Sequence, residues 1–257
     1  MTSTERFRVP GGVGADLAVT VESPGPSPAG TVVLSHAFGS SKDLRALRRI
    51  ADRLTERGWT AVRYDLTGLG ESDGDFADTT LTTNVDDLRA VAAWLDGRGR
   101  PPGVLFGLSL GGAASILAAP SLPSVRVVAS CATPATTSHL RDTLLAHAPR
   151  LAEGGRAEIE VVGKRVSVGA PLLEDLERWD LLEAVSGLDR AYVAFHGVRD
   201  EIVSIDHAAE LFRAARHPKS FVSLGDADHL MLGDERDAFL VADALVAFAA
   251  RYAASPG

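Results

Sequence analysis

Residues 103–119 read Gly-Val-Leu-Phe-Gly-Leu-Ser-Leu-Gly-Gly-Ala-Ala-Ser-Ile-Leu-Ala-Ala, a short apolar run followed at once by small and apolar residues. The run 103–108 is typical of a strand that is buried on both faces, and the run 110–119 is typical of a helix. Between them, Gly107-Leu108-Ser109-Leu110-Gly111 matches the G-x-S-x-G pattern of a sharp strand-to-helix turn. Such a turn exposes a serine hydroxyl at a sheet edge, so Ser109 is the predicted nucleophile.

A second match to the same pattern, Gly70-Glu71-Ser72-Asp73-Gly74, lies in a polar, glycine-rich loop. The two carboxylates beside Ser72 disfavour a negatively charged nucleophile. We therefore expect Ser72 to be a loop residue. For Ser109, the alternative is an ordinary helix-capping serine, which the strand-turn-helix context makes the weaker interpretation.

Short apolar runs alternate with amphipathic runs along most of the chain. We expect strands near residues 7–9, 17–22, 31–37, 60–65, 103–108, 125–132, 191–197 and 219–224. We expect helices near residues 41–57, 82–95, 110–119, 205–215 and 238–252. The alternation predicts an α/β fold with a mostly parallel sheet and helices on both faces. Ligands bind such sheets beyond the carboxyl ends of their strands.

The alternation is interrupted between residues 133 and 187. This segment predicts a helical piece at 139–152, a hairpin at 158–169 that turns at Gly163-Lys164, and a helix at 171–185. Its length favours a small inserted cap over an ordinary connection. The predicted organisation is a core of residues 1–132 and 188–257 and a cap of residues 133–187.

Composition excludes several classes of protein. The chain has 257 residues, of which 46% are hydrophobic, and a net charge of −8. These values argue against disorder and against nucleic acid as a partner. No apolar run approaches the roughly 20 residues of a membrane span, and the N-terminus shows no signal-peptide core. The single cysteine, Cys131, cannot form an internal disulfide, so we expect a cytoplasmic protein that does not bind membranes.

A nucleophilic serine needs a base, and the base needs a group that orients it. Of the seven histidines, His229 follows the last predicted strand in a loop that can reach the sheet edge. Asp200 follows the preceding strand in His196-Gly197-Val198-Arg199-Asp200, and it completes the chain order Ser, Asp, His. We predict His229 as the base and Asp200 as the orienting acid. Competitors for the acid are Glu201, Asp226 and Asp228, of which the last two are more typical of turn residues.

The other histidines have simpler interpretations. His36 and His196 end strands and are expected to pack or to bond the backbone, while His207 and His217 are expected at the surface. His139 and His147 lie in the predicted cap, where they can contact substrate. A metal site at Asp200, Asp226, Asp228 and His229 is the alternative for the acidic loops. Their spacing matches no ligand motif, so we expect no metal and no cofactor.

Acyl transfer also needs two N–H donors for the developing oxyanion. The residue after the nucleophile, Leu110, supplies the first donor in the predicted turn. The loop after the strand at 31–37, His36-Ala37-Phe38-Gly39-Ser40, is the expected source of the second, and we assign the N–H of Phe38.

Taken together, His-Ala-Phe-Gly at 36–39, Asp-Leu-Thr-Gly-Leu-Gly-Glu-Ser at 65–72, Gly-Leu-Ser-Leu-Gly-Gly at 107–112 and the His-Gly-x-x-Asp at 196–200 resemble the α/β-hydrolase superfamily. The resemblance implies an eight-stranded sheet, with the second strand antiparallel, and a triad of Ser109, His229 and Asp200. Residues 41–54, 67–79, 205–212 and 217–224 are also similar to the hydrolase module that some bacterial proteins fuse to an OsmC-like domain. The cap resembles that of cinnamoyl and feruloyl esterases. Leu108 departs from the family, in which histidine often precedes the serine.

The sequence thus predicts a serine hydrolase that cleaves carboxylic esters of small to medium acyl groups through an acyl-enzyme. A small-molecule ester is the expected partner, and the oligomeric state stays open. The alternatives on this scaffold are a thioesterase, an amidase, a C–C bond hydrolase or a perhydrolase. A non-catalytic ligand-binding protein is the alternative from another class, although binding alone does not need all three triad groups.

Overall fold

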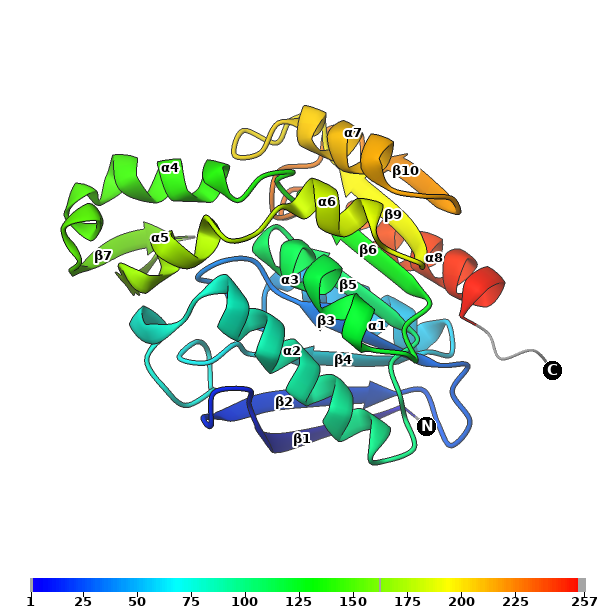
Figure 1. Ribbon diagram of the computed structural model, residues 1–257. Coiled ribbons are helices and arrows are strands. Elements are labelled where there is room, and N and C mark those ends of the chain that lie inside the picture. Colours follow the sequence, from blue (N-terminus) through cyan, green and yellow to red (C-terminus); the bar gives the residue numbers. More distant parts are fainter. Residues whose placement is uncertain (1, 162, 254–257) are drawn as a thin grey trace.

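The structure is a computed structural model that describes residues 2–161 and 163–253, and within these ranges eight strands form one sheet. The spatial order is β1 (Ser3–Pro10), β2 (Asp16–Ser23), β4 (Thr60–Tyr64), β3 (Thr31–Ser35), β5 (Val104–Leu108), β6 (Val127–Cys131), β9 (Ala191–His196) and β10 (Lys219–Ser223). Strand β2 runs antiparallel to both of its neighbours, and the strands from β4 to β10 are parallel (Figure 1). The predicted α/β fold, with a mostly parallel eight-stranded sheet and an antiparallel second strand, is confirmed.

Helices cover both faces of the sheet (Figure 1). Helices α1 (Arg45–Glu56) and α8 (Glu235–Tyr252) pack together on one face, against alternate strand residues such as Val104 and Phe106. Helices α2 (Leu81–Asp96), α3 (Leu110–Ala118), α6 (Leu181–Ser186) and α7 (Ile205–Ala214) lie on the other face, towards Leu105. Side chains alternate between the two faces along each strand, which explains why the central strands are continuously apolar.

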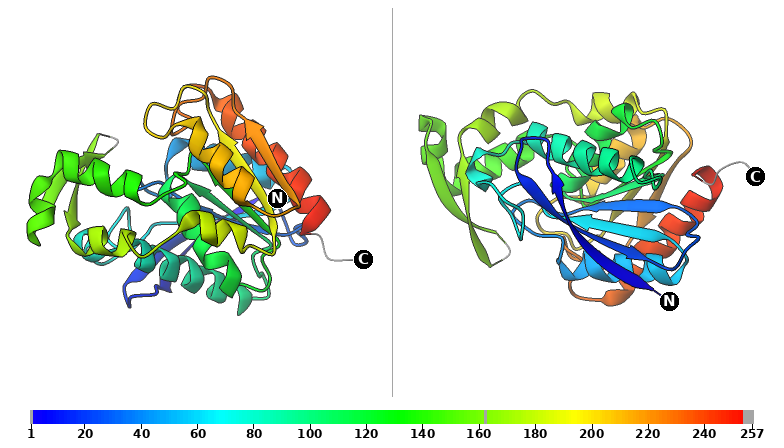
Figure 2. Two further views of the ribbon diagram at one scale, coloured as in Figure 1. Left: turned by 45° about the horizontal axis from the view of Figure 1, so that its top comes forward. Right: turned by 90° about the horizontal axis from the view of Figure 1, so that it is seen from below.

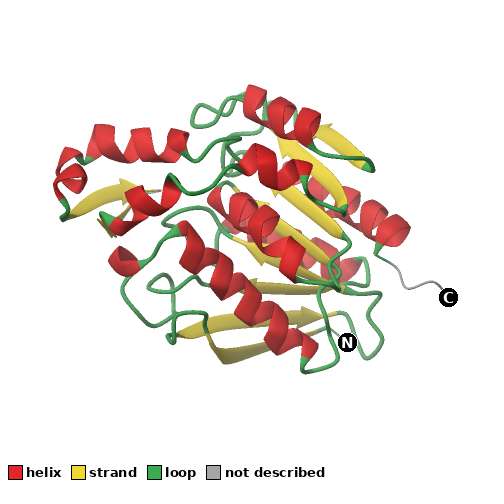
Figure 3. Cartoon of the chain, viewed as in Figure 1, coloured by secondary structure: helices red, strands yellow, loops and turns green. Residues whose placement is uncertain are grey.

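The part of the chain from α4 to α5, between β6 and β9, stands apart from the sheet, as Figures 2 and 3 show. It holds α4 (Ser138–His147), the 3-10 helix η3 (Pro149–Glu153), a separate hairpin of β7 (Arg156–Val161) and β8 (Lys164–Gly169), and α5 (Pro171–Leu176). The predicted hairpin is present, with Gly163 in the left-handed region at φ 71°. Val162, which is part of the predicted hairpin, lies outside the described residues.

The predicted helix at 171–185 is wrong, because two short helices, α5 and α6, occupy this stretch. The carbonyl of Leu176 accepts a hydrogen bond from Thr137 Oγ1 at 2.5 Å instead of continuing the helix. The side chain of Asp180 then accepts from the N–H of Glu183 at 2.9 Å and starts α6. As a result α6 packs against α3 and α7 on the sheet, although it belongs to the stretch predicted as cap.

Polar contacts fasten the cap to the carboxyl end of the sheet. The carboxylate of Asp175 in α5 accepts hydrogen bonds from the N–H and the hydroxyl of Thr82 at the start of α2. Arg156 in β7 pairs with Asp75 and Asp78, each at 2.6 Å, in and beside the 3-10 helix η1 (Phe76–Asp78). The cap is therefore held over the loop that follows β4.

Residues 119–121 form a further 3-10 helix, η2 (Ala119–Ser121), after α3. Among the helices of the described ranges, none combines the length and the apolar character needed to cross a membrane.

Strand β5 and helix α3 cross in direct backbone contact. A Cβ added to Gly107 would lie 2.0 Å from the carbonyl oxygen of Gly111, and a Cβ added to Gly111 would lie 2.6 Å from that of His36. Neither position has room for a side chain. The glycines of the G-x-S-x-G pattern are therefore required by packing as well as by the turn.

We expect Gly107→Ala to lower the free energy of unfolding by about 2 kcal/mol or more, because backbone atoms must move apart to admit the methyl group. Urea denaturation followed by circular dichroism measures this change. Gly97→Ala is the matched control, since Gly97 has a right-handed φ of −60° and an added Cβ would meet nothing closer than 3.6 Å. Equal stability of the two variants would contradict the prediction.

Candidate active site

Ser109 has the backbone geometry of a strained turn. It lies between β5 and α3 with φ 54° and ψ −119°, a conformation that residues other than glycine rarely adopt. Its N–H donates to the carbonyl of Cys131 at 2.8 Å, and its own carbonyl accepts from Gly112 N–H and from Thr133 Oγ1. Ser109 is partly exposed, while Leu108 and Leu110 beside it are buried. The turn thus presents the hydroxyl of Ser109 at the carboxyl end of β5.

His229 and Asp200 form a hydrogen-bonded pair, with His229 Nδ1 2.8 Å from Asp200 Oδ2. The Asp200 side chain is 1% exposed, and its Oδ1 also accepts from the N–H groups of Ile202 and Val203. Burial alone would raise the pKa of Asp200, but the hydrogen bonds from His229 and the two backbone groups outweigh it and lower the pKa. The carboxylate is therefore ionised near neutral pH and accepts a hydrogen bond from His229 Nδ1–H, which leaves Nε2 unprotonated in the neutral ring.

The three predicted triad residues follow parallel strands of one sheet. Ser109 follows β5, Asp200 follows β9, and His229 follows β10. Cys131 links the first and last of these loops, because its carbonyl holds Ser109 N–H and its sulfur lies 3.9 Å from the sulfur of Met231. Within the described ranges, no hydrogen bond joins Ser109 Oγ to the imidazole of His229. Such bonds are often long in enzymes without substrate.

The two backbone groups predicted for the oxyanion are unoccupied donors. In the described part of the chain, neither the N–H of Phe38 nor that of Leu110 donates a hydrogen bond to a protein acceptor. Leu110 is the first residue of α3, and the N–H groups in the first turn of a helix have no partner within that helix. Phe38 is buried, and its ring packs against Phe76 with 5.3 Å between centroids.

The second G-x-S-x-G serine has a structural role. Ser72 Oγ donates to the carbonyl of Asp65 at 2.7 Å and accepts from the N–H of Ala18 at 2.9 Å. The bond to Asp65 closes the loop after β4 on itself, and the bond from Ala18 ties this loop to strand β2. This arrangement agrees with the prediction that Ser72 is a loop residue.

Two of the three competing acids, Asp226 and Asp228, have other partners, and the third, Glu201, is exposed. Asp226 pairs with exposed Arg199 at 3.1 Å, and Asp228 accepts from the N–H groups of Leu230, Leu232 and Gly233 as a turn residue. In the described ranges, no three His, Cys, Asp or Glu side chains lie close enough to hold a metal ion.

His36 and His196 are buried and bond the backbone, as predicted. Their Nδ1 atoms lie 2.8 Å from Ala37 O and 2.9 Å from Gly197 O, so each Nδ1 carries a proton that it donates. Burial lowers the pKa of both imidazoles. Both rings are therefore neutral near pH 7.

Two further histidines connect the cap to the loop that holds Asp200. His139 Nε2 donates to the carbonyl of Ile202 at 2.9 Å, and His207 Nδ1 accepts from the N–H of Ala135 at 3.3 Å. The expectation that His207 is simply a surface residue is wrong, because it is half-buried against the segment leading into α4. Nothing in the local sequence indicates this long-range contact.

A cleft of about 410 Å³ lies beside the loop of Phe38. Its walls come from that loop, from the glycine-rich loop after β4 and from the cap hairpin, and they include Gly39, Ser40, Leu69, Phe76, Val166 and Ser167. The cap therefore helps to form the walls of a cavity at the carboxyl end of the sheet.

Comparisons with known proteins agree with the fold and identify the family. Residues 26–166 match the family described as serine aminopeptidase, S33 (Hydrolase_4). The solved esterase domain of a Rhodothermus marinus protein is 36% identical with a TM-score of 0.78, covering 98% of this chain and 99% of that one. A search of curated proteins gives no match.

Two more distant structures share the fold. Est1E from Butyrivibrio proteoclasticus, solved with ferulic acid, is 16% identical with a TM-score of 0.77 and covers 95% of this chain and 100% of its own. XC6422 from Xanthomonas campestris, described as an α/β serine hydrolase without a lid, is 24% identical with a TM-score of 0.68, covering 99% and 97%.

The fold and the turn at Ser109 define the class of protein, which is that of the α/β-hydrolases. Within that class, the chain belongs to the serine aminopeptidase S33 family of hydrolases. The likeness to modules fused to OsmC-like domains stays a prediction.

The two buried histidines predict how stability depends on pH. Because burial lowers the folded-state pKa of His36 and His196, the unfolded chain binds more protons below about pH 6.5. Their contribution to stability is complete above that pH and is lost as the pH falls, by at most about 1.4 kcal/mol per pH unit for each imidazole. Urea denaturation between pH 7 and 5 measures this loss. NMR titration of either imidazole near pH 6.5 in the folded protein would contradict it.

Proposed function

We propose that the protein is a serine hydrolase that cleaves carboxylic esters of small to medium acyl groups through an acyl-enzyme. The observation that carries the proposal is the bond between His229 Nδ1 and buried Asp200, at the same sheet edge as strained Ser109. The 36% identical Rhodothermus marinus structure, described as an esterase domain, supports the choice of ester.

In the first half of the reaction, Ser109 Oγ attacks the ester carbonyl while His229 Nε2 takes its proton. The N–H groups of Phe38 and Leu110 donate to the oxygen that becomes negative. Asp200 keeps the imidazole in the required tautomer and stabilises the imidazolium as it forms. The intermediate collapses when His229 protonates the leaving alcohol, which produces the acyl-enzyme.

In the second half, His229 takes a proton from water, and the water attacks the acyl carbonyl. The same two N–H groups hold the second oxyanion, and Ser109 leaves with the proton returned by His229. Every catalytic group in these proposed reaction steps is supplied by the protein chain. The proposed reaction therefore needs no cofactor.

Cleavage of amides is the second candidate, because the family description names aminopeptidases. An aminopeptidase must bind a free ammonium group, for which an unpaired carboxylate beside the cleft would serve. Among the described lining residues, Asp75 is the acidic one, and it already pairs with Arg156. This arrangement favours the ester. Thioesterase, C–C hydrolase and perhydrolase activities stay alternatives on the same scaffold.

A non-catalytic ligand-binding role is the remaining alternative. Binding alone does not need a backbone-strained serine beside a hydrogen-bonded His–Asp pair, and such strain costs about 1–3 kcal/mol. Labelling by a fluorophosphonate probe separates the two, because it requires an activated serine. A screen over acyl chain length, with aryl and cinnamoyl esters included, then defines the substrate range.

Ser109→Ala should abolish turnover of p-nitrophenyl acetate and butyrate, because the nucleophile is removed. Ser72→Ala is the matched control from the second G-x-S-x-G sequence. It should keep turnover but lower stability by about 1–2 kcal/mol, since Ala18 N–H loses its acceptor. Initial rates and urea denaturation measure both effects. Full activity in Ser109→Ala would refute the assignment.

Asp200→Asn should lower kcat for p-nitrophenyl butyrate by about 10³- to 10⁴-fold, because a neutral amide cannot stabilise the imidazolium and disturbs the tautomer. Asp226→Asn is the control, since this exposed carboxylate pairs only with exposed Arg199 among the described residues. It should leave kcat unchanged. A loss of less than about tenfold in Asp200→Asn would argue for another acid.

A further inference from the structure

The sequence 65–72, which helped to indicate the fold, has no part in the triad chemistry, yet it lies against the loop that carries Phe38. We propose that Asp65 and Lys42 are positioning residues that hold this loop, residues 36–42, and so keep the Phe38 N–H in place for the oxyanion. The inference rests on the proposed function, because that function gives Phe38 its role.

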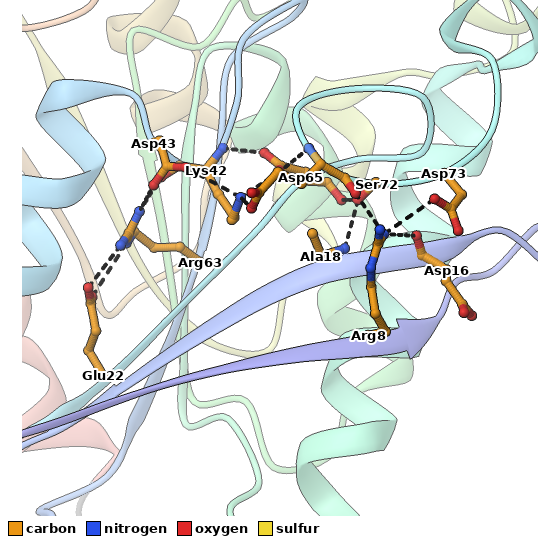
Figure 4. Close-up of polar contacts among 11 residues, drawn as sticks. Arg8, Asp16, Ala18, Glu22, Lys42, Asp43, Arg63, Asp65, Ser72 and Asp73 are labelled. Carbon is orange, nitrogen blue, oxygen red and sulfur yellow. Dashed lines mark hydrogen bonds and ion pairs between the residues drawn. The ribbon is translucent and has the colours of Figure 1, made fainter.

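Asp65 is a fully buried carboxylate at the end of β4, with 0% of its side chain exposed. Its Oδ1 accepts from Lys42 N–H at 2.7 Å, and its Oδ2 accepts from Lys42 Nζ at 2.7 Å (Figure 4) and from Glu71 N–H at 2.9 Å. A buried group with these donors cannot shift without leaving polar atoms unpaired. Asp65 therefore fixes the loop before α1 and the loop after β4 to each other.

The N-terminal end of the Phe38 loop, at His36, is fixed to Leu66, the residue after Asp65. The N–H of Leu66 donates to His36 Nε2 at 3.2 Å, while His36 Nδ1 donates to Ala37 O. The loop is thus attached to Leu66 at its first residue, His36, and to Asp65 at its last residue, Lys42, and Phe38 lies between these two attachments. The position of the Phe38 N–H depends on both.

Lys42 is buried as well, with 3% of its side chain exposed, and Nζ also donates to Glu71 at 2.5 Å. Burial alone would lower the pKa of Lys42, but the hydrogen bonds to Asp65 and Glu71 outweigh it and raise the pKa. The ammonium is therefore charged at the pH of any ester assay. The backbone carbonyl of Lys42 accepts a hydrogen bond from Arg63 Nη1 at 2.6 Å, and Arg63 pairs with Glu22 in β2 (Figure 4).

The spacing of the motif follows from this carboxylate. Gly70 has a φ of 58°, and a Cβ added there would lie 2.2 Å from the carboxyl carbon of Asp65. The chain after β4 therefore wraps around Asp65 so closely that no side chain fits at position 70. Asp65 and Gly70 therefore have linked roles: Asp65 binds the two loops, and Gly70 lets the chain pass close to its carboxylate.

Removing the charge of Lys42 leaves buried Asp65 without its cationic partner, and removing the charge of Asp65 leaves Lys42 with only the exposed carboxylates of Glu71 and Asp43. Either change favours rearrangement of the loop. If the Phe38 N–H moves, it stabilises the oxyanion less. Loss of one oxyanion donor costs about 10²- to 10³-fold in kcat. Because this interaction strengthens in the transition state, KM should change little.

The experiment compares wild type with Lys42→Met, Asp65→Asn and the double variant, using p-nitrophenyl butyrate. Each single variant should lose about 10²-fold in kcat with KM within about threefold. Affinity for butylboronic acid, whose adduct with the serine mimics the oxyanion, should fall in parallel. The double variant should regain stability, because neither charge is left alone, but should not regain kcat.

Asp243→Asn is the matched control. Asp243 pairs with Arg53 and Arg57 between α8 and α1, away from the Phe38 loop, so its loss should change stability without changing kcat or boronate affinity. Circular dichroism confirms that each variant is folded at the assay temperature. A kcat within about threefold of wild type in the folded single variants would overturn the proposal, as would a rise in KM alone.

If the single variants do not fold, Glu71→Gln decides the question. It removes one charged partner of Lys42 Nζ at an exposed side chain and so loosens the attachment of Lys42, while Asp65 still compensates the buried ammonium and the protein is expected to fold. A measurable fall in kcat and boronate affinity supports the proposal. Unchanged values, together with single variants that do not fold, would overturn it and would show that Lys42 and Asp65 contribute only to stability. The wild-type rate tests the proposed function, and only the ratio of variant to wild type tests this inference.

Discussion

The backbone contact between β5 and α3 is the constraint on which the site depends. Gly107 lets β5 touch α3, and Gly111 lets α3 approach the end of β3 at Ser35 and His36. The chain turns between β5 and α3 at Ser109, which has a positive φ. At the first turn of the helix, the N–H of Leu110 has no acceptor among residues 2–161 and 163–253. The strain at Ser109 persists because both elements are buried in the layers of the fold.

Two buried carboxylates organise the loops around this turn. Asp200 collects the N–H groups of Ile202 and Val203 together with the ring of His229. Asp65 collects the N–H groups of Lys42 and Glu71 together with an ammonium. In each case a desolvated anion is compensated by several donors from separate parts of the chain. The ring of His229 and the loop of Phe38 are thus each held by a buried carboxylate with several donors.

The differences between prediction and structure are instructive at particular residues. The apolar pattern of 171–185 is compatible with one helix, but Thr137, far away in the chain, takes the carbonyl that would have continued it. His207 has the sequence context of a surface residue, but it is half-buried in contact with Ala135 N–H and the ring of His139. The role of Asp65 was equally hidden, because its three donors come from Lys42 and Glu71 across two loops. Long-range hydrogen bonds of this kind leave no local periodicity to read.

Local patterns were sufficient for the strands and for the helices of the core, and they are the basis on which Ser109, Asp200 and His229 are predicted as a triad. Short-range constraints determine the continuous apolar strands, the glycines around Ser109 and the positions of Asp200 and His229 after strands. These features can therefore be predicted from the sequence alone. The hydrogen bond from His229 to Asp200, the attachment of the cap and the burial of Lys42 against Asp65 required folding. These contacts join residues that are distant in sequence, and their strength comes from the desolvation that only the packed molecule provides.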